Sequence, residues 1–329
     1  MEYRTLGKSG IQASVVGLGT WALGGTSWWG PTDDAEAIRA IQAALDSGIN
    51  LIDTAPVYGW GHSEEIVGRA VKGRRDKVVL ATKCGLRWQD GHGAPFFSLD
   101  GREVRRCLER PYVRQELELS LKRLGTDYVD LYQTHWPAVE PFKTPIAETM
   151  GLLMDLKREG KIRAIGASNV TVAEMDAYRA VGQLDSNQPR YSLLDRRIEP
   201  AVVPYCMEHG VSILAYSPLE QGLLTGRISL DTAIDAAEYR NLLPWFKPGN
   251  RRRVLDMLAK WSELCRRYQC TLRQLVIACT LAQPGITHAL CGGRKVLHAQ
   301  ENAQAGSLRI EPVDMARMRR DVESLGTPA

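Results

Sequence analysis

Residues 129–167 read VDLYQTHWPAVEPFKTPIAETMGLLMDLKREGKIRAIGA, and this stretch shows the pattern that decides the fold. Its two apolar runs, Val129–Thr134 and Ile162–Ala167, have the length of buried strands. Between them Thr144 precedes Pro145, which predicts a helix N-cap followed by proline at the first helical position. Because a helical connection returns the chain in the same direction, the two strands are predicted to be parallel neighbours.

The same alternation of strand and helix continues from one end of the chain to the other. Eight such units favour an α/β fold with a closed (β/α)8 TIM barrel over an open sheet. Barrels of this kind form one domain at this length, so we expect residues 1–329 to be a single domain. The predicted strands are Val15–Gly17, Asn50–Asp53, Val78–Lys83, Val129–Thr134, Ile162–Ala167, Asp185–Gln188, Val211–Tyr216 and Thr287–Cys291.

Three segments lie outside this repeat. Tyr3–Leu6 and Ile11–Ala13 flank a turn bounded by glycines, which predicts a β-hairpin ahead of the first barrel strand. Two connections are longer than ordinary loops: Gly85–Arg110 after the third strand and Pro218–Asn250 after the seventh. Long loops are usually functional or mobile, and we expect the second to close over a bound cofactor as a lid.

The composition is that of a globular protein, with 44% hydrophobic and 24% charged residues. It excludes a disordered, collagen-like or coiled-coil chain. A net charge of +4 is too small to indicate a nucleic acid or membrane partner. Seven cysteines without a C-x-x-C pair, and an N-terminus without an apolar segment, predict reduced thiols in a cytoplasmic protein. No spacing typical of a metal site is present, and the sequence does not distinguish a monomer from a homo-oligomer.

Four polar residues stand where predicted strands end, which is where barrels of parallel strands carry their sites. Asp53, Lys83 and His135 each end a strand, and Tyr58 follows Asp53 closely. A lysine ammonium lowers the pKa of a neighbouring phenol, and a histidine can donate a hydrogen bond to a developing alkoxide. Considered one at a time, Asp53 and Lys83 would be interpreted as a structural ion pair, and His135 and Tyr58 as side chains without a catalytic role. Four coincidences at strand ends favour proton-transfer chemistry.

Residues 53–68, DTAPVYGWGHSEEIVG, resemble the signature of the aldo-keto reductases. The resemblance extends along almost the whole chain, in the order that the family pattern has. Thr144–Thr149 and Ser217–Gly226 are most similar to bacterial members that reduce methylglyoxal and other short aldehydes. The other matching segments are Gly17–Trp21, Leu131–Pro137, Gly166–Asn169, Ala215–Gly226 and Glu301–Asn302.

The resemblance implies roles for individual residues. Tyr58 would donate the proton, and Lys83, Asp53 and His135 would tune it. Asn and Gln side chains can pair with the nicotinamide carboxamide, and a tyrosine can stack on its ring. The implied cofactor-binding residues are Gly19, Thr20, Trp21, Asp53, Ser168, Asn169, Gln188, Tyr216, Ser217, Leu219, Gly222, Arg294, Lys295, His298, Glu301 and Asn302.

Arg294 and Lys295 follow the eighth strand, where the family holds the adenosine end of the cofactor. Two adjacent cations suit a 2′-phosphate, so NADP(H) is the expected cofactor. NAD remains the alternative, because His298 stands where arginine or glutamine is common and some similar enzymes prefer NADH. The pattern of Gly17–Ala22 fits a Rossmann fingerprint, but Leu23-Gly24-Gly25 follows instead of a helix, which excludes that fold.

The expected function is NADP(H)-dependent reduction of small aldehydes and α-oxoaldehydes by hydride transfer. The partner would be a small carbonyl compound in a pocket with aromatic walls, formed by Trp21, Trp60, Trp88 and Trp136. Two alternatives stay open: an NAD-dependent alcohol or sugar dehydrogenase of the same family, and a non-catalytic redox-sensing subunit like the potassium-channel β subunits.

Overall fold

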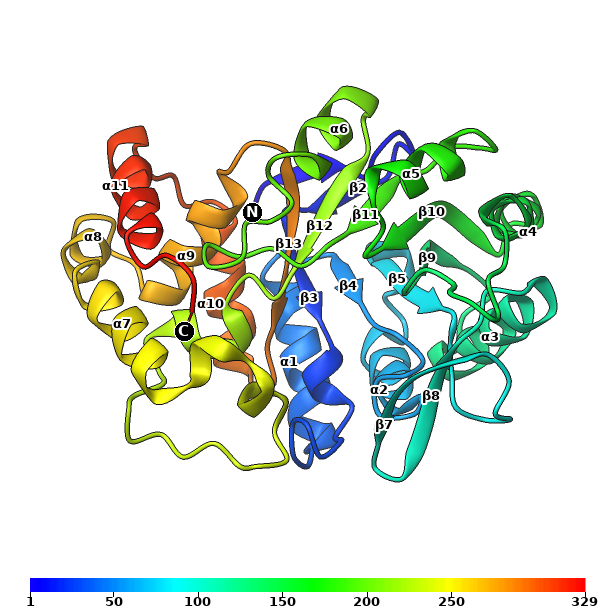
Figure 1. Cartoon of the computed structure of the whole chain (residues 1–329), viewed down its shortest axis with the longest axis horizontal. Helices are drawn as coiled ribbons and strands as arrows, with labels where there is room; N and C mark the ends of the chain where they lie inside the picture. The colour runs from blue at the N-terminus through cyan, green and yellow to red at the C-terminus, as the bar shows by residue number, and fades with distance from the viewer. Residues whose placement is uncertain (329) are drawn as a thin grey trace.

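The computed structural model describes residues 1–328. Within this range eight parallel strands close into a barrel, which confirms the predicted (β/α)8 architecture (Figure 1). The strands follow chain order, and the last pairs with the first to close the ring. They are β3 (Val16–Gly19), β4 (Leu51–Asp53), β5 (Val79–Cys84), β9 (Val129–Thr134), β10 (Ile162–Ser168), β11 (Ser186–Gln188), β12 (Ser212–Tyr216) and β13 (Ile286–Gly292).

Helices cover the outside of the barrel (Figure 1). The predicted cap at Thr144 is wrong: α4 begins at Ile146 with an extended Pro145 as its cap residue, and the Thr144 hydroxyl makes no hydrogen bond. The helices are α1 (Asp34–Asp46), α2 (His62–Val71), α3 (Arg110–Leu124), α4 (Ile146–Arg158), α5 (Val172–Arg179), α6 (Val202–His209), α7 (Pro248–Ala259), α8 (Ser262–Arg267), α9 (Leu272–Leu281), α10 (Val296–Ala305) and α11 (Pro312–Glu323).

The predicted hairpin is present as β1 (Tyr3–Thr5) and β2 (Gln12–Ser14), and it covers the N-terminal end of the barrel. The Gly7 amide in its turn donates to the Ser212 hydroxyl at the start of β12, over 2.7 Å. Gly7 has a φ of +54°, and a Cβ there would lie 2.1 Å from the Asp185 carbonyl oxygen, so glycine is required.

Apolar side chains from the hairpin and the strands fill the barrel interior together. This leaves the carboxyl ends of the strands as the open end of the barrel. The interior residues are Leu6, Ile11, Ala13, Leu51, Val79, Ala81, Leu131, Ala164, Leu214 and Leu290.

The long connection after β5 is a small antiparallel sheet, although the sequence predicted a loop there. It consists of β6 (Leu86–Arg87), β7 (Ala94–Leu99) and β8 (Arg102–Arg106), and β7 and β8 project from the barrel (Figure 1). The strands are short and rich in arginine and phenylalanine, so they lack the apolar alternation by which strands are recognised.

The long connection after β12 contains short 3₁₀-helices at Glu220–Thr225, Tyr239–Leu242 and Pro244–Phe246 before α7 begins. It meets the loop after β3, because the Tyr239 amide donates to the Trp28 carbonyl over 3.3 Å. The ring of Trp28 also lies 5.1 Å from that of Phe97 on β7. Three connections therefore meet over the open end of the barrel.

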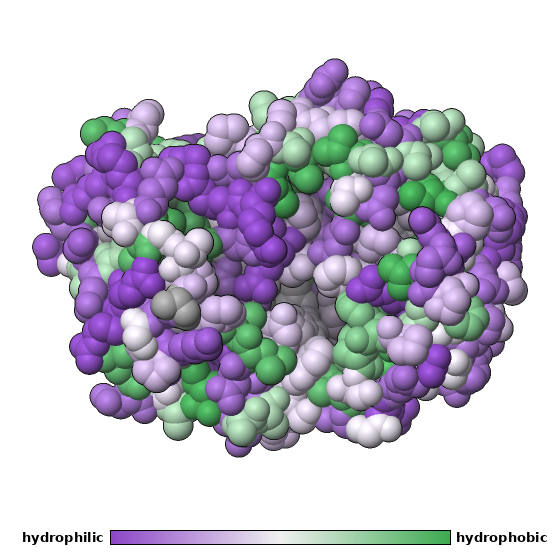
Figure 2. Space-filling view, in the orientation of Figure 1, coloured by the Kyte–Doolittle hydropathy of each residue, from purple (hydrophilic) through white to green (hydrophobic). Residues whose placement is uncertain are grey.

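No helix within residues 1–328 is both long and apolar enough to span a membrane. Hydrophobic side chains are scattered among hydrophilic ones on the face shown in Figure 2.

Candidate active site

A buried lysine connects the four residues predicted at the strand ends. Lys83 Nζ on β5 lies 2.5 Å from Asp53 Oδ1, 3.0 Å from the Thr54 carbonyl oxygen and 3.3 Å from the phenol oxygen of Tyr58. An ammonium group has three hydrogens to donate, and each has an acceptor here. Because Tyr58 accepts from Lys83, its own hydrogen is free to point into the cavity that Tyr58 lines.

The pKa of Tyr58 is shifted in the direction opposite to the one predicted. Burial raises the pKa of Tyr58 well above its usual 10, and the charge of Asp53 adds to the rise. The expected lowering by Lys83 is wrong because Asp53 lies closer to the ammonium than the phenol does and balances its charge. Burial also lowers the pKa of Lys83, while Asp53 acts in the opposite direction. Tyr58 therefore keeps its proton at neutral pH.

His135 is neutral at physiological pH. Burial lowers the pKa of His135 well below its usual 6.5, and the charge of Lys83 lowers it further. Its ring stands edge-on to Tyr58, with centroids 5.7 Å apart, and both residues line the cavity. A neutral imidazole has one N–H to donate, so His135 can hydrogen-bond an oxygen bound beside Tyr58 but cannot contribute a charge.

Two glutamine amides hold the second carboxylate oxygen of Asp53. Gln188 Nε2 on β11 donates to Asp53 Oδ2 over 2.8 Å, and Gln133 Nε2 on β9 does so over 3.2 Å. Sequence reasoning missed Gln133. The signal was available, because Gln133 stands two residues after Leu131, whose side chain points into the barrel.

A cavity of about 600 Å³ extends from Tyr58 and His135 along the carboxyl ends of the strands to Arg294 and His298. Most of the predicted site residues line it. Those that do are Gly19, Trp21, Tyr58, His135, Trp136, Ser168, Asn169, Gln188, Tyr216, Ser217, Leu219, Gly222, Arg294 and His298. Those that lie outside the lining are Thr20, Asp53, Lys83, Trp60, Trp88, Lys295, Glu301 and Asn302.

Only two of the four tryptophans predicted for the pocket reach it. Trp21 and Trp136 line the cavity, whereas Trp60 and Trp88, whose rings lie 5.5 Å apart, pack in the same apolar cluster as Trp136 without reaching the cavity lining. Trp28 and Trp29, which also stand on a loop that follows a strand end, line the cavity as well. Sequence reasoning missed three further wall residues, Phe96, Phe97 and Tyr239.

A hydrogen-bonded group stands at the middle of the cavity, at the ends of β10 to β12. The Tyr216 hydroxyl donates to Asn169 Oδ1 over 2.9 Å, and Asn169 Nδ2 donates to Ser168 Oγ over 3.1 Å. Ser168 in turn donates to the Gln188 carbonyl over 2.7 Å. The bonds fix the orientation of an amide, a hydroxyl and an aromatic ring, which suits recognition of a carboxamide-bearing ring.

The turn at residues 217–222 has a strained backbone. Ser217, Glu220 and Gln221 have φ values of +60°, +45° and +48°, and left-handed conformations of this kind cost about 1–3 kcal/mol each. The Glu220 carboxylate holds the turn by accepting from Arg190 over 2.6 Å and from Ser192 over 2.5 Å. Such turns direct main-chain N–H groups into anion-binding concavities, so this wall suits a pyrophosphate.

At the far end of the cavity, Glu301 is bound by two arginines that were not predicted. Arg227 Nη2 contacts both carboxylate oxygens at 3.0 and 3.1 Å, and Arg273 Nε lies 3.3 Å away. Arg273 also donates to Asn302 Oδ1 over 3.2 Å. Glu301 and Asn302 therefore position Arg273. Arg273 lines the cavity, whereas Glu301 and Asn302 do not.

The cations predicted to hold a 2′-phosphate are not gathered around one point. Arg294 donates to the Trp29 carbonyl over 2.8 Å, and Lys295 is an exposed cap residue of α10 outside the cavity lining. Burial lowers the pKa of His298 to about 4, and the charges of nearby arginines lower it further, so His298 is neutral.

A carboxylate already occupies the start of α10. The Val296 amide donates to Glu36 Oε1 of α1 over 3.3 Å, and Arg39 pairs with the other oxygen over 2.7 Å. A free helix N-terminus attracts anions. At α10, Glu36 already places a negative charge at this end.

Comparisons with known proteins agree with this geometry. Residues 15–322 match the Aldo/keto reductase family. The chain is 44% identical to the NADH-specific methylglyoxal reductase of Escherichia coli (strain K12), over 99% of both chains. Its fold is similar to the glycerol dehydrogenase of Gluconobacter oxydans, with 37% identity, a TM-score of 0.85 and coverage of 97% of this chain and 94% of that one. It also resembles an aldo/keto reductase of Klebsiella pneumoniae in complex with NADP and acetate, with 27% identity, a TM-score of 0.73 and coverage of 97% and 95%.

Proposed function

The chain belongs to the aldo/keto reductase family of oxidoreductases, and we propose that it reduces short aldehydes and α-oxoaldehydes, of which methylglyoxal is an example, to alcohols. The observation that carries the proposal is the contact of Lys83 with Tyr58, which leaves the phenol hydrogen directed toward the cavity. The family uses nicotinamide cofactors, and a nicotinamide bound in the cleft would supply the hydride. The 44% identity to a methylglyoxal reductase supports the substrate class.

Tyr58 acts as the proton donor in this proposal. It holds its proton at rest because its pKa is raised, and an alkoxide that forms beside it is basic enough to take that proton. The neighbouring Lys83 ammonium then stabilises the phenolate that Tyr58 becomes. His135 donates its neutral N–H to the same oxygen and orients the carbonyl.

The aromatic wall selects the substrate. Trp21, Trp28 and Trp136 stand around the space beside Tyr58, and they offer apolar faces to a compact molecule. Arg240, which follows the wall residue Tyr239, is already paired with Glu238 over 2.7 Å. A short, uncharged carbonyl compound fits these walls.

For the cofactor we favour NADH over the NADPH that Arg294 and Lys295 suggested. Glu36 occupies the helix end that would otherwise bind the 2′-phosphate, and His298 is neutral. The Escherichia coli relative is NADH-specific, although the Klebsiella pneumoniae relative was solved with NADP. If NADH is the cofactor, replacing both Arg294 and Lys295 by alanine leaves the KM for NADH unchanged; a rise confined to NADPH would restore these cations as phosphate ligands.

A second candidate reaction is oxidation of a small polyol with NAD. The likeness to a glycerol dehydrogenase at a TM-score of 0.85 favours it, and the same four residues would run the reaction in reverse. The complete catalytic set argues against a non-catalytic sensor. All seven cysteines are unpaired thiols, which supports a reducing compartment, the cytoplasm.

The decisive experiment measures both directions in one enzyme preparation. NADH and NADPH oxidation by methylglyoxal and by other short aldehydes would be compared with NAD reduction by glycerol. We expect kcat/KM to be highest for methylglyoxal with NADH. Faster oxidation of glycerol than reduction of any aldehyde would support the dehydrogenase, and oxidation of bound NADH in a single turnover only would support a sensor.

A further inference from the structure

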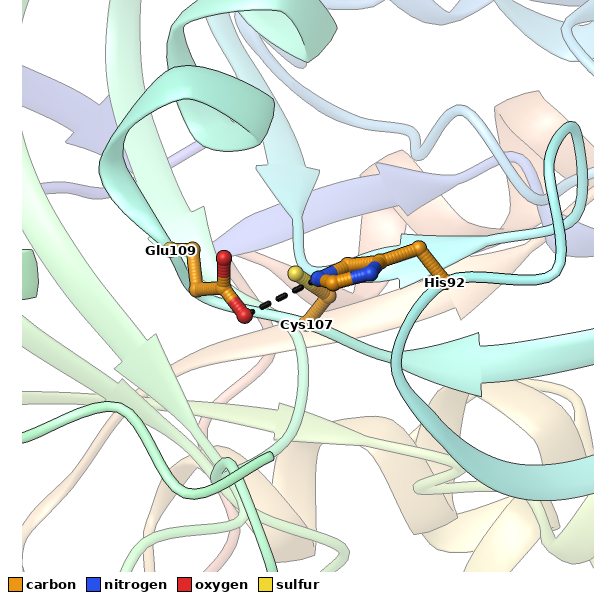
Figure 3. A group of neighbouring side chains, drawn as sticks. All are labelled: His92, Cys107 and Glu109. Atoms are coloured by element: carbon orange, nitrogen blue, oxygen red, sulfur yellow. Dashed lines mark hydrogen bonds and ion pairs between the residues drawn. The ribbon is translucent and has the colours of Figure 1, made fainter. Parts of the chain in front are cut away.

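Three potential metal ligands converge at the base of the small sheet, away from Tyr58. His92 precedes β7, Cys107 follows β8, and Glu109 precedes α3. Figure 3 shows their side chains directed toward one another, and their ligand atoms all lie within 4.8 Å of each other. His92 Nε2 and Glu109 Oε1 are 3.0 Å apart. The spacing 92, 107 and 109 matches no metal-binding motif, so this group could not be predicted from sequence.

We propose that His92, Cys107 and Glu109 bind a divalent transition-metal ion of the zinc class, with water as the fourth ligand. Imidazole, thiolate and carboxylate are the three ligand types that zinc takes from proteins. Zinc bonds of about 2.0–2.3 Å at tetrahedral angles place ligand atoms about 3.5 Å apart. His92 and Glu109 are only partly buried, so their side chains have room to adjust toward Cys107.

Packing around the site limits how far its side chains need to move when an ion binds. The Cys107 amide donates to the Gly85 carbonyl over 3.1 Å, and its thiol is buried. Gly93 permits the approach of the two strands, because a Cβ there would lie 2.7 Å from a carbonyl oxygen and 3.1 Å from Cys107 Cβ. The His92 ring lies between Tyr112 and Phe142, with centroids 4.6 and 4.9 Å away.

Charges near the site are mixed. Arg87 stacks on Tyr112 at 4.1 Å, and Asp90 at 2.5 Å counters its charge. Burial raises the pKa of the Cys107 thiol to about 11, so the sulfur carries its proton until an ion replaces it. Binding therefore forms the metal–sulfur bond and releases one proton to solvent for each ion bound.

An ion at this site would stiffen one wall of the cavity. Arg106 directly precedes Cys107, and its guanidinium stacks on Phe96 at 3.8 Å and lies 5.1 Å from the Trp136 ring. Both rings line the cavity. The metal would act on substrate binding through this wall rather than on proton transfer, and its binding does not depend on the proposed reaction.

The test is a Co²⁺ titration of the full-length protein after treatment with a chelator. Cobalt reports a thiolate ligand through a near-ultraviolet charge-transfer band and reports tetrahedral geometry through its visible bands. We expect one Co²⁺ per chain and a thiolate band that Zn²⁺ displaces. The Cys107→Ser variant should lose the band. Loss of a residue that only orients a ligand weakens metal binding by about 10–100-fold, so loss of the ligand itself in His92→Asn should weaken it by at least that factor.

Cys270→Ser is the matched control, because it removes a half-buried thiol on the other side of the barrel. Its titration should match that of the wild type. Circular dichroism and thermal unfolding check that each variant is folded. If Cys107→Ser does not fold, Glu109→Gln is titrated in its place. The proposal is overturned if the wild type shows no thiolate band, or if a band persists in folded Cys107→Ser or Glu109→Gln with unchanged affinity.

Discussion

The ammonium group of Lys83 donates a hydrogen bond of 3.3 Å to the phenol oxygen of Tyr58. The pKa of that phenol is nevertheless raised, because burial and Asp53 outweigh the lysine charge. The lysine therefore orients the phenol and stabilises the phenolate formed during the reaction, and does not ionise the tyrosine at rest. This relationship leads to separate expectations for the two residues.

Tyr58→Phe should remove the transferable proton and keep the ring, which packs 6.4 Å from Trp21 and 5.7 Å from His135. General acid catalysis contributes typically about 10²–10⁴-fold, so kcat for methylglyoxal should fall by that factor. Cofactor affinity, measured by quenching of tryptophan fluorescence, should be unchanged. A kcat within about tenfold of wild type would assign the proton to another group.

Lys83→Met should lower both activity and stability. Asp53 is only 3% exposed, and loss of its ion partner leaves a buried charge, which costs about 3–5 kcal/mol. Urea unfolding measures this loss. The double variant Lys83→Met with Asp53→Asn removes both charges, so it should regain most of the stability and none of the activity. Equal instability of the single and double variants would contradict a role for charge.

The pH dependence of reduction should be nearly flat. Tyr58 stays protonated because its pKa is raised, and His135 stays neutral because its pKa is lowered. We expect kcat for methylglyoxal to be constant from about pH 6 to about pH 10, the ordinary pKa of a tyrosine. Alcohol oxidation should instead rise with pH, since Tyr58 must then accept a proton. A decline of reduction centred near pH 7 would show that His135 is the acid.

Glu36→Gln should shift cofactor preference toward NADPH. Glu36 lies on α1, and the change removes its negative charge from beside the start of α10 and weakens the acceptor of the Val296 amide. A charge at an exposed helix end has a modest effect, so the KM for NADPH should fall a few-fold while that for NADH stays constant. Asp46→Asn, at the other end of α1, is the control. Equal changes in KM for NADH and NADPH would show that Glu36 does not act by repelling the 2′-phosphate.

His288 should make the fold sensitive to acid. It is fully buried on β13, and burial lowers its pKa from 6.5 to about 4. Between these values the unfolded chain binds more protons than the folded one, so this contribution to stability is complete above pH 6.5 and is lost as pH falls toward 4. The loss amounts to about 3 kcal/mol.

Urea unfolding at a series of pH values measures this contribution. The free energy of unfolding should fall less steeply with acid in His288→Asn, whose amide can still donate to the Ser14 carbonyl. His209→Asn, at a partly exposed position, should follow the wild type. Parallel curves for wild type and His288→Asn would refute this origin of acid sensitivity.

The barrel was predictable because its strands are short apolar runs between helices with clear starts. The runs at Val129–Thr134 and Ile162–Ala167 match β9 and β10 to within a residue. The sheet at β6 to β8 was not predictable in the same way. Its strands are held by pairing with each other, and residues such as Arg105 and Arg106 carry no apolar period.

Positions at strand ends were easier to predict than the electrostatics around them. Asp53, Lys83 and Tyr58 lie together, as expected for residues at or just after the carboxyl ends of neighbouring parallel strands. The sign of the Tyr58 pKa shift depends on burial and on which partner is nearer to Lys83, and neither is encoded in spacing. The same holds for Glu36, which reaches α10 across about 260 residues of sequence.

Trp28, Phe97 and Tyr239 pack together over the open end of the barrel. Their packing separates the part of the protein that contacts substrate from the part that transfers the proton. The three residues come from three different connections, whereas the buried Lys83–Asp53 pair stands on the barrel strands. Substitutions in one connection can change the shape of the cavity entrance while Lys83, Asp53 and Tyr58 keep their positions. A combinatorial library limited to positions 28, 97 and 239 would therefore explore new substrates at little risk to turnover, and natural divergence has the same route open to it.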